Sequence, residues 1–282
     1  MRRIRRQEGL QGHRLRPRRQ HRRLQEGRRR HAGLRGGLTP THRQDASAFA
    51  PKALVFDVFG TVVDWRTSVA AAVRAFAVRH GLRLDPERFA DAWRAGYLPA
   101  MQRVRSGELP WTKLDRLHRL ILDQVLADFG VGGVPEPELA ELNRAWRRLT
   151  PWPDAVPGLT RLRRGFTIAP LSNGNISLMI DLARFAGLPW DCILGAELVR
   201  HYKPDPEVYL GAAAFLDLAP AEVMMVAAHL GDLQAAKAVG LSTAFVARPL
   251  EYGPAGGADL EADRFVDLTA SDFVDLAAQL GA

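Results

Sequence analysis

The chain has 282 residues, of which 47% are hydrophobic, and this is enough for one packed domain plus a smaller inserted or appended one. The formal net charge of +8 is uneven: residues 1–45 hold 15 Arg and three acidic residues (+12), so the remaining 24 basic and 28 acidic residues carry −4. Overall charge is therefore no argument that the folded body binds nucleic acid.

Cysteine content and hydropathy exclude several further classes. Cys192 is the only cysteine, which rules out a disulfide within the chain and favours a reducing, cytoplasmic setting. No run of about 18 apolar residues is present, so no membrane partner is expected. The first residues lack the apolar segment of a secretory signal.

Residues 1–50 are rich in Arg, Gln, Gly and His and show neither the helical nor the strand period, which predicts disorder. Three interpretations stay open: a basic arm for nucleic acid or an anionic surface, an organelle transit peptide, or upstream sequence included through a misassigned start. Low serine content and the lack of an apolar face count against a transit peptide. We favour the misassigned start, because the globular pattern begins only near Phe49.

A short apolar, β-branched run beginning at Ala53 predicts a fully buried strand that stops at Asp57, before Gly60 and Thr61 turn the chain. In a doubly wound parallel sheet, ligands bind beyond the carboxyl ends of the strands, so Asp57 is a candidate functional residue. An Asp in this place can also simply cap the next turn. The functional interpretation gains weight from polar residues at the ends of later strands.

Residues 68–151 show the helical period in four successive segments with no strand between them. The first is expected to start at an N-cap on Thr67 or Ser68. The second is expected to be a single helix from Pro86 through Val104, with Arg94 at the edge of its apolar stripe. Four helices inserted after the first strand predict a helical cap domain (68–151) covering the site of a core domain made of 51–67 and 152–282.

From Trp152 onward, strands alternate with helices, which predicts an α/β fold with a doubly wound, Rossmann-like parallel sheet. Pro170 lacks an N–H donor and is expected to end the pairing of its strand. A C-terminal helix is expected to begin at Asp272. The expected strands are 166–171, 192–194, 223–227 and 243–247.

Polar groups follow three of these strands, and a lysine precedes a helix in the same half of the fold. This arrangement suits covalent catalysis by Asp57, with Lys203 holding it ionised and Asp232 orienting Lys203. Backbone N–H groups at the start of the helix after Asn173 would bind a carboxylate or phosphate. The groups at the strand ends are Asp57, Ser172 with Asn173, and His229 with Asp232.

Four motifs resemble those of the haloacid dehalogenase-like hydrolase superfamily, in order and spacing, over roughly residues 53–250. They are Asp57-Val58-Phe59-Gly60-Thr61, Leu171-Ser172-Asn173-Gly174, Tyr202-Lys203-Pro204-Asp205 and Asp232.

This superfamily consists mostly of phosphatases, so the reaction must be argued from the site. Phosphatases of the family usually carry a second Asp where this chain has Phe59, which protonates the leaving alcohol. A halide leaves as a stable anion and needs no acid, so Phe59 favours cleavage of a carbon–halogen bond. Asp57 and Asp232 supply few oxygen ligands for a divalent ion, and no metal and no cofactor are expected.

The chain most resembles the type II 2-haloacid dehalogenases, whose cap carries a Trp-Arg pair like Trp93-Arg94. The resemblance implies that Asp57 displaces halide from the α-carbon of a small 2-haloacid with inversion, and that water then hydrolyses the aspartyl ester to a 2-hydroxy acid. It implies the following roles: Arg94 and Asn173 bind the halide, Ser172 and neighbouring amides hold the substrate carboxylate, Thr61 and Tyr209 support Asp57, and Lys203 with Asp232 sets the charge and the hydrolytic water.

The sequence departs from better-known members just before the last Asp, where Ser, Asn and Trp are replaced by Ala227, His229 and Gly231. His229 is a candidate base for ester hydrolysis, because imidazole titrates near neutrality; a His after a buried strand can equally serve only to satisfy backbone groups. The alternatives are a Mg²⁺-dependent phosphatase or phosphonatase, and an anion- or nucleic-acid-binding protein acting through its arm. Similar enzymes are often dimers, so a homodimer is a further expectation.

Overall fold

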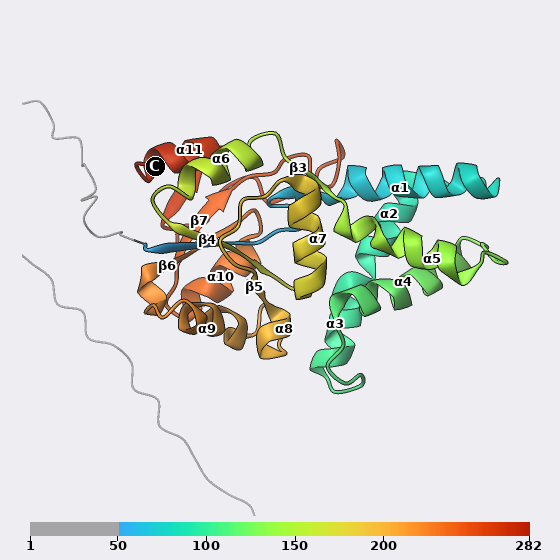
Figure 1. The fold of residues 1–282 in the computed structure, drawn as a ribbon, viewed down its shortest axis with the longest axis horizontal. Coiled ribbons are helices and arrows are strands. Elements are labelled where there is room, and N and C mark those ends of the chain that lie inside the picture. Colours follow the sequence, from blue (N-terminus) through green and yellow to red (C-terminus); the bar gives the residue numbers. More distant parts are fainter. Residues whose placement is uncertain (1–50) are drawn as a thin grey trace, which may run out of the picture. The chain divides into compact units, whose positions relative to one another are not determined.

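The computed structural model describes residues 51–282, which belong to one compact unit. The interpretations offered above for residues 1–50 lie outside the described part of the chain. Six parallel strands form the central sheet in the order β5-β4-β1-β6-β7-β8 (Figure 1). Their bounds are β1 Ala53–Phe56, β4 Thr167–Ser172, β5 Leu194–Gly195, β6 Val223–Ala227, β7 Ser242–Val246 and β8 Leu268–Ala270.

Helices cover both faces of this sheet, and β1 is therefore buried on both sides. Leu54 and Phe56 pack into the apolar cluster that includes α6, α7 and α11, whereas Val55 packs into the cluster that includes α9 and α10. The predicted doubly wound α/β sheet is confirmed. The helices are α6 Ala155–Leu162, α7 Ile176–Ala186, α8 Ala196–Val199, α9 Pro206–Phe215, α10 Leu230–Ala238 and α11 Phe273–Gln279, with a 3₁₀ turn, η2, at Pro220–Glu222.

The remaining helices gather beside the sheet (Figure 1). In the sequence they are inserted between two short antiparallel strands that pair with each other. These strands are β2 (Val63–Asp64) and β3 (Thr150–Pro151), so the chain leaves the sheet and returns to it through one paired segment. The inserted helices are α1 Trp65–His80, α2 Pro86–Ala95, α3 Tyr97–Arg105, α4 Leu114–Asp128 and α5 Glu136–Asn143, followed by the 3₁₀ helix η1 at Arg144–Arg147.

Two expectations about these helices are wrong. Helix α1 begins at Trp65, because the Asp64 carboxylate accepts the Thr67 N–H and caps the helix earlier than predicted. The segment expected as one helix is two, α2 and α3, separated at Gly96. A Cβ at Gly96 would lie 2.3 Å from Cγ2 of Ile121, so the close approach of α4 requires glycine at this break.

The strands in the second half of the chain differ from the expectation in several places. The pairing of β4 with β1 ends at Pro170, as expected, but β4 continues to Ser172 because its other edge pairs with β5. The strand expected over residues 192–194 is β5, at Leu194–Gly195. Strand β8 was not predicted, whereas Asp272 is the N-cap of α11 as expected. Within residues 51–282, no helix is both long and apolar enough to cross a membrane.

Candidate active site

A cavity of about 510 Å³ lies at the carboxyl ends of the central strands and is closed on one side by α2 and α3. This is the edge at which an open α/β sheet binds its ligands. Eight of the ten predicted site residues line it, together with apolar and aromatic residues of the inserted helices. The predicted residues are Asp57, Phe59, Arg94, Asn173, Lys203, Tyr209, His229 and Asp232, and the helices add Ala95, Tyr97, Leu98 and Met101.

Asp57 is the centre of the polar contacts in this cavity. Its Oδ2 accepts a hydrogen bond of 2.7 Å from Thr61 Oγ1, and its Oδ1 accepts one of 2.8 Å from Lys203 Nζ. Nδ1 of His229 lies 3.1 Å from Oδ2. Thr61 does not itself line the cavity, and its hydroxyl also accepts the Ala228 N–H at 3.0 Å, which ties the end of β1 to the end of β6.

Two cations hold Asp57 in its ionised form. Burial by itself would raise the pKa of this carboxyl, but the charges and hydrogen bonds of Lys203 and His229 outweigh burial and hold the pKa well below its usual range. Burial lowers the pKa of Lys203, while Asp232 and Asp57 raise it by more, so Lys203 stays an ammonium. The carboxylate is buried and charged, as a nucleophile needs to be.

Asp232 and Tyr209 support Lys203 from its other side. Lys203 Nζ also donates to Asp232 Oδ2, while the Tyr209 hydroxyl donates to Asp232 Oδ1 at 2.6 Å. Burial raises the pKa of Asp232, and Lys203 opposes that rise. The structure therefore brings Tyr209 to Asp232, whereas the sequence had predicted that it would support Asp57.

Arg94 enters the cavity from the end of α2. Its guanidinium carbon lies 4.3 Å from the centre of the Tyr97 ring and 5.4 Å from that of Trp65. Nη1 of Arg94 is buried and has no hydrogen-bond partner among the described residues. A buried cationic donor without a partner is costly, which is typical of a group that binds an anion.

The loop after β4 contains two predicted residues, and only one of them reaches the cavity. Asn173 Oδ1 accepts the Lys203 N–H at 2.7 Å, and its Nδ2 lies 3.4 Å from Met101 Sδ and 3.5 Å from the Lys203 carbonyl. The Asn173 side chain also contacts the Tyr97 hydroxyl. Ser172 is fully buried, does not line the cavity, and accepts the Gly174 N–H at 3.0 Å.

Side chains of the protein itself occupy the anion site that was expected at the start of α7. The Ile176 N–H donates to Oε2 of Glu197 at 2.7 Å, and the Asn175 side chain binds Asp115. These partners come from α8 and α4, which lie far from this loop in the sequence.

Phe59 provides no acid or base beside Asp57. It is buried, with its ring packed edge-on against Trp146 at 5.9 Å and against His118 at 6.3 Å. Trp93 does not line the cavity and is a core residue whose indole donates to the His118 carbonyl at 2.9 Å. Phe59 therefore presents an apolar ring to the cavity beside Asp57.

Glu251 is a site residue that the sequence analysis missed. Its carboxylate is 1% exposed and lies 2.9 Å from His229 Nε2, while Trp65 Nε1 donates to it at 3.1 Å. Burial lowers the pKa of His229, but hydrogen bonds and charges from Asp57 and Glu251 raise it to about 10. The available signal was its place after the strand expected over 243–247, because that strand ends at the same edge as Asp57.

The carboxylates of the site are directed at cations of the protein itself. Asp57 and Asp232 both bind Lys203 Nζ, and Glu251 binds His229. Among residues 51–282, no group of three or more His, Cys, Asp or Glu side chains is arranged to hold a metal ion.

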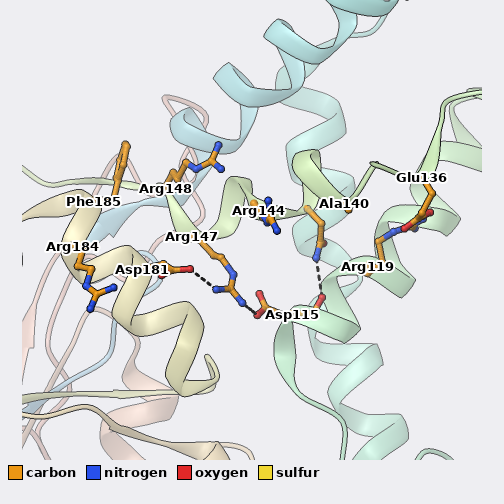
Figure 2. Close-up of a pocket in the computed structure, with 11 residues that line it drawn as sticks. Asp115, Arg119, Glu136, Ala140, Arg144, Arg147, Arg148, Asp181, Arg184 and Phe185 are labelled. Atoms are coloured by element: carbon orange, nitrogen blue, oxygen red, sulfur yellow. Dashed lines mark hydrogen bonds and ion pairs between the residues drawn. The ribbon is translucent and has the colours of Figure 1, made fainter. Parts of the chain in front are cut away.

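A second cavity, of about 630 Å³, lies between α4, α5 and α7 and contains none of the predicted residues (Figure 2). Arg147 bridges its two sides, with ion pairs to Asp115 on α4 and to Asp181 on α7 (Figure 2). These contacts join the inserted helices to the helix that follows β4. The cavity is mixed in charge and is held together by its own ion pairs.

Comparison with known proteins places these residues in a family. A family model described as haloacid dehalogenase-like hydrolase matches residues 51–240. The (S)-2-haloacid dehalogenase 1 of Pseudomonas sp. (strain CBS-3) is 32% identical over 216 residues, which cover 71% of this chain and 88% of that protein.

Solved structures extend the likeness to the whole fold. The crystal structure of a defluorinating L-2-haloacid dehalogenase is 52% identical with a TM-score of 0.81, covering 82% of this chain and 96% of that one. The L-2-haloacid dehalogenase from Xanthobacter autotrophicus, solved with chloropropionic acid covalently bound, is 27% identical with a TM-score of 0.68, covering 82% and 99%. The chain belongs to the haloacid dehalogenase-like hydrolase family.

Proposed function

We propose that this protein is a hydrolase of carbon–halogen bonds, of the (S)-2-haloacid dehalogenase type, which converts short 2-haloalkanoic acids to 2-hydroxy acids. The observation that carries the proposal is one cavity that contains an ionised, buried Asp57, an unpartnered cationic nitrogen of Arg94 and the inert ring of Phe59. Halide displacement requires a nucleophile and an anion site, and it needs no carboxylic acid at the position of Phe59, because a halide leaves as a stable anion.

In the first step, a carboxylate oxygen of Asp57 attacks the α-carbon opposite the halogen. A carbon–oxygen bond forms, the carbon–halogen electron pair leaves with the halide, and the carbon inverts. Lys203 and Thr61 orient the carboxylate by donating to its two oxygens. Asp232, held by Tyr209, fixes the position of Lys203.

The departing halide gains charge as the bond breaks, and Arg94 and Asn173 are the donors that we assign to it. Arg94 lines the cavity with a nitrogen that has no hydrogen-bond partner, and Asn173 lines it with an amide nitrogen that makes only weak contacts with Met101 Sδ and the Lys203 carbonyl. Donors that await a developing charge lower the barrier without being reorganised during the reaction. Ser172 is not a binding residue for the substrate carboxylate, since its hydroxyl is buried, accepts the Gly174 N–H and does not line the cavity.

In the second step, water attacks the carbonyl carbon of the Asp57 ester and releases the 2-hydroxy acid. The covalent complex of chloropropionic acid with the Xanthobacter autotrophicus enzyme supports such an intermediate by analogy. No step needs a metal ion or a cofactor.

We further propose that residues 68–151 act as a cap domain over a core made of 51–67 and 152–282. The paired strands β2 and β3 join the two, and α2 and α3 contribute Arg94 and the apolar wall of the cavity. A cytoplasmic location and a homodimer stay predictions, the second of which size-exclusion chromatography with light scattering would test.

Halide release tests the function directly. Purified protein with EDTA is given chloroacetate, fluoroacetate and each enantiomer of 2-chloropropionate, and wild type is compared with Asp57→Asn. We expect halide from wild type, with the S enantiomer preferred, and none from the variant. Phosphate release from a phosphoester on addition of Mg²⁺, with no halide from any haloacid, would instead favour a phosphatase. Loss of dehalogenation on deletion of residues 1–48 would contradict our assignment of the site to the folded body.

A further inference from the structure

Glu251 is a buried carboxylate that the two steps above leave without a task. It is 1% exposed and lies in the loop after β7, beyond the end of the family-model match at residue 240. Its contacts include Trp65 Nε1 at 3.1 Å, His229 Nε2 at 2.9 Å and the hydroxyl of Tyr252. A buried charge is retained only where it is paired, and its ionic partner here is a residue that touches the nucleophile.

The surrounding structure holds Glu251 in place from two sides. Gly60 has a φ of +93°, and a Cβ there would lie 2.1 Å from Oε1 of Glu251, so the motif glycine leaves room for this carboxylate. Buried Arg248 anchors the loop: its Nε donates to the Thr61 carbonyl at 2.8 Å, and its own carbonyl accepts the Glu251 N–H at 3.0 Å. The position of Glu251 is therefore tied to the loop that carries Asp57.

We propose that Glu251 is the positioning residue that makes His229 the base of ester hydrolysis. This inference rests on the proposed function and concerns only its second step. Glu251 binds one ring nitrogen of His229, which directs the other, Nδ1, at the Asp57 carboxyl group whose carbon the water must attack. The imidazole is 26% exposed and lines the cavity, so water can reach it.

The charges around His229 change between the two steps. In the resting enzyme it lies between two carboxylates, Asp57 from the end of β1 and Glu251 from the loop after β7, while Lys203 and Arg94 are the cations of the same cavity. His229 is then an imidazolium, with its pKa raised to about 10 against the opposing effect of burial. Alkylation removes the charge of Asp57 and so lowers the pKa of His229. Glu251 still favours the imidazolium, whereas burial and the nearby cations favour a ring that is neutral at Nδ1.

Protons balance over the cycle on this scheme. After alkylation, His229 releases one proton to solvent, which is the proton that the overall reaction liberates. The neutral ring next takes a proton from water as the hydroxide adds to the Asp57 carbonyl carbon. The intermediate collapses with cleavage of the bond between the acyl carbon and the product oxygen. The proton of the added hydroxyl passes to that oxygen, leaving the Asp57 carboxylate and the imidazolium as at the start.

The test separates the two chemical steps in Glu251→Gln, which keeps the shape of the side chain and removes its charge. Quenched-flow measurement of chloride from (S)-2-chloropropionate is combined with mass spectrometry of the peptide that contains Asp57. We expect a burst of one chloride per site, steady-state turnover lower by about 10²–10⁴-fold, and an accumulated propionate ester on Asp57. His229→Gln should do the same, and it covers the case in which Glu251→Gln fails to fold.

Asp267→Asn is the matched control, since Asp267 is also a poorly exposed, cation-paired carboxylate, bound to Lys237 outside the cavity. It should accumulate no ester. Turnover of Glu251→Gln and His229→Gln at the wild-type rate would overturn the role of Glu251, and so would slow turnover of these two variants with no accumulated ester. Either result would leave the dehalogenase proposal intact. A wild-type protein that releases no halide from any haloacid would instead refute the proposed function itself.

Discussion

Replacing Arg94 should change the rate of halide release far more than it changes the free energy of unfolding. We consider Arg94→Met, which keeps a long apolar stem and removes the guanidinium. The folded protein loses cation–π contacts with Tyr97 at 4.3 Å and with Trp65 at 5.4 Å, worth about 0.5–2 kcal/mol each. It also loses a buried, unpartnered donor, whose removal returns about 1–3 kcal/mol. The effects oppose each other, so we expect the free energy of unfolding to change little.

The effect of Arg94→Met on catalysis should be much larger. A hydrogen bond from a charged donor to the halide is worth about 1.5–3 kcal/mol, which corresponds to a rate lower by about 10- to 150-fold. The loss should appear in the alkylation step, measured as single-turnover chloride release from (S)-2-chloropropionate, with stability followed by thermal unfolding. No ester should accumulate, because the step that forms it is the slow one.

A matched control lies on the same helix. Arg88 also places its guanidinium over an aromatic ring, that of Phe129 at 5.8 Å, but it does not line the cavity. Arg88→Met should therefore leave chloride release unchanged. The assignment of Arg94 to the halide would be refuted if Arg94→Met released chloride at the wild-type rate. It would also be refuted if Arg94→Met and Arg88→Met lost the same amount of activity.

Three further predictions concern pH, pocket size and the turn beside Asp57. The pKa of His229 rises on folding from 6.5 to about 10, so the stability that its charge provides is complete below pH 6.5 and is lost as pH rises toward 10. The melting temperature of the protein should therefore fall over this pH range, and it should fall less in His229→Gln. Gly231→Ala adds a methyl group to open space in the cavity wall on α10, so it should raise stability by up to about 1 kcal/mol and lower kcat/KM for longer haloacids relative to chloroacetate. Gly60→Ala should lower the melting temperature by several degrees and slow turnover, because its methyl group displaces Glu251; a normal melting temperature would contradict the close packing described.

The inserted helices show where the apolar period stops being informative. The apolar stripe through Trp93, Tyr97 and Met101 predicted one helix, but Gly96 and Pro99 interrupt it. Pro99 has no N–H to donate to the carbonyl of Ala95, four residues earlier, so the ladder of helical hydrogen bonds is broken at this point. The close approach of Ile121 of α4 also leaves no room for a Cβ at position 96. The apolar period alone does not show this break, whereas the residue types at positions 96 and 99 do.

The structure changed the predicted roles of Tyr209 and Ser172. Ser172 belongs to one of the four motifs and Tyr209 follows another by four residues, so both were expected near Asp57. The direction of a side chain, however, depends on its neighbours in space. Tyr209 points to Asp232, which comes from α10, and Ser172 caps its own turn at Gly174. Motif membership predicted the neighbourhood and not the hydrogen-bond partner.

The sequence by itself determined the parallel α/β architecture and the strand end that carries Asp57. These two features depend on residue type and short-range period, which a single chain displays directly. The pairing of Lys203 with Asp232 was expected only because parallel strands end at one edge of the sheet. Only the tertiary structure decided that Arg94 has an unpartnered nitrogen in the cavity, that Ser172 does not reach it, and that Glu251 completes a pair with His229. Those are contacts across long sequence separations, set by how helices and loops pack, and no local pattern encodes them.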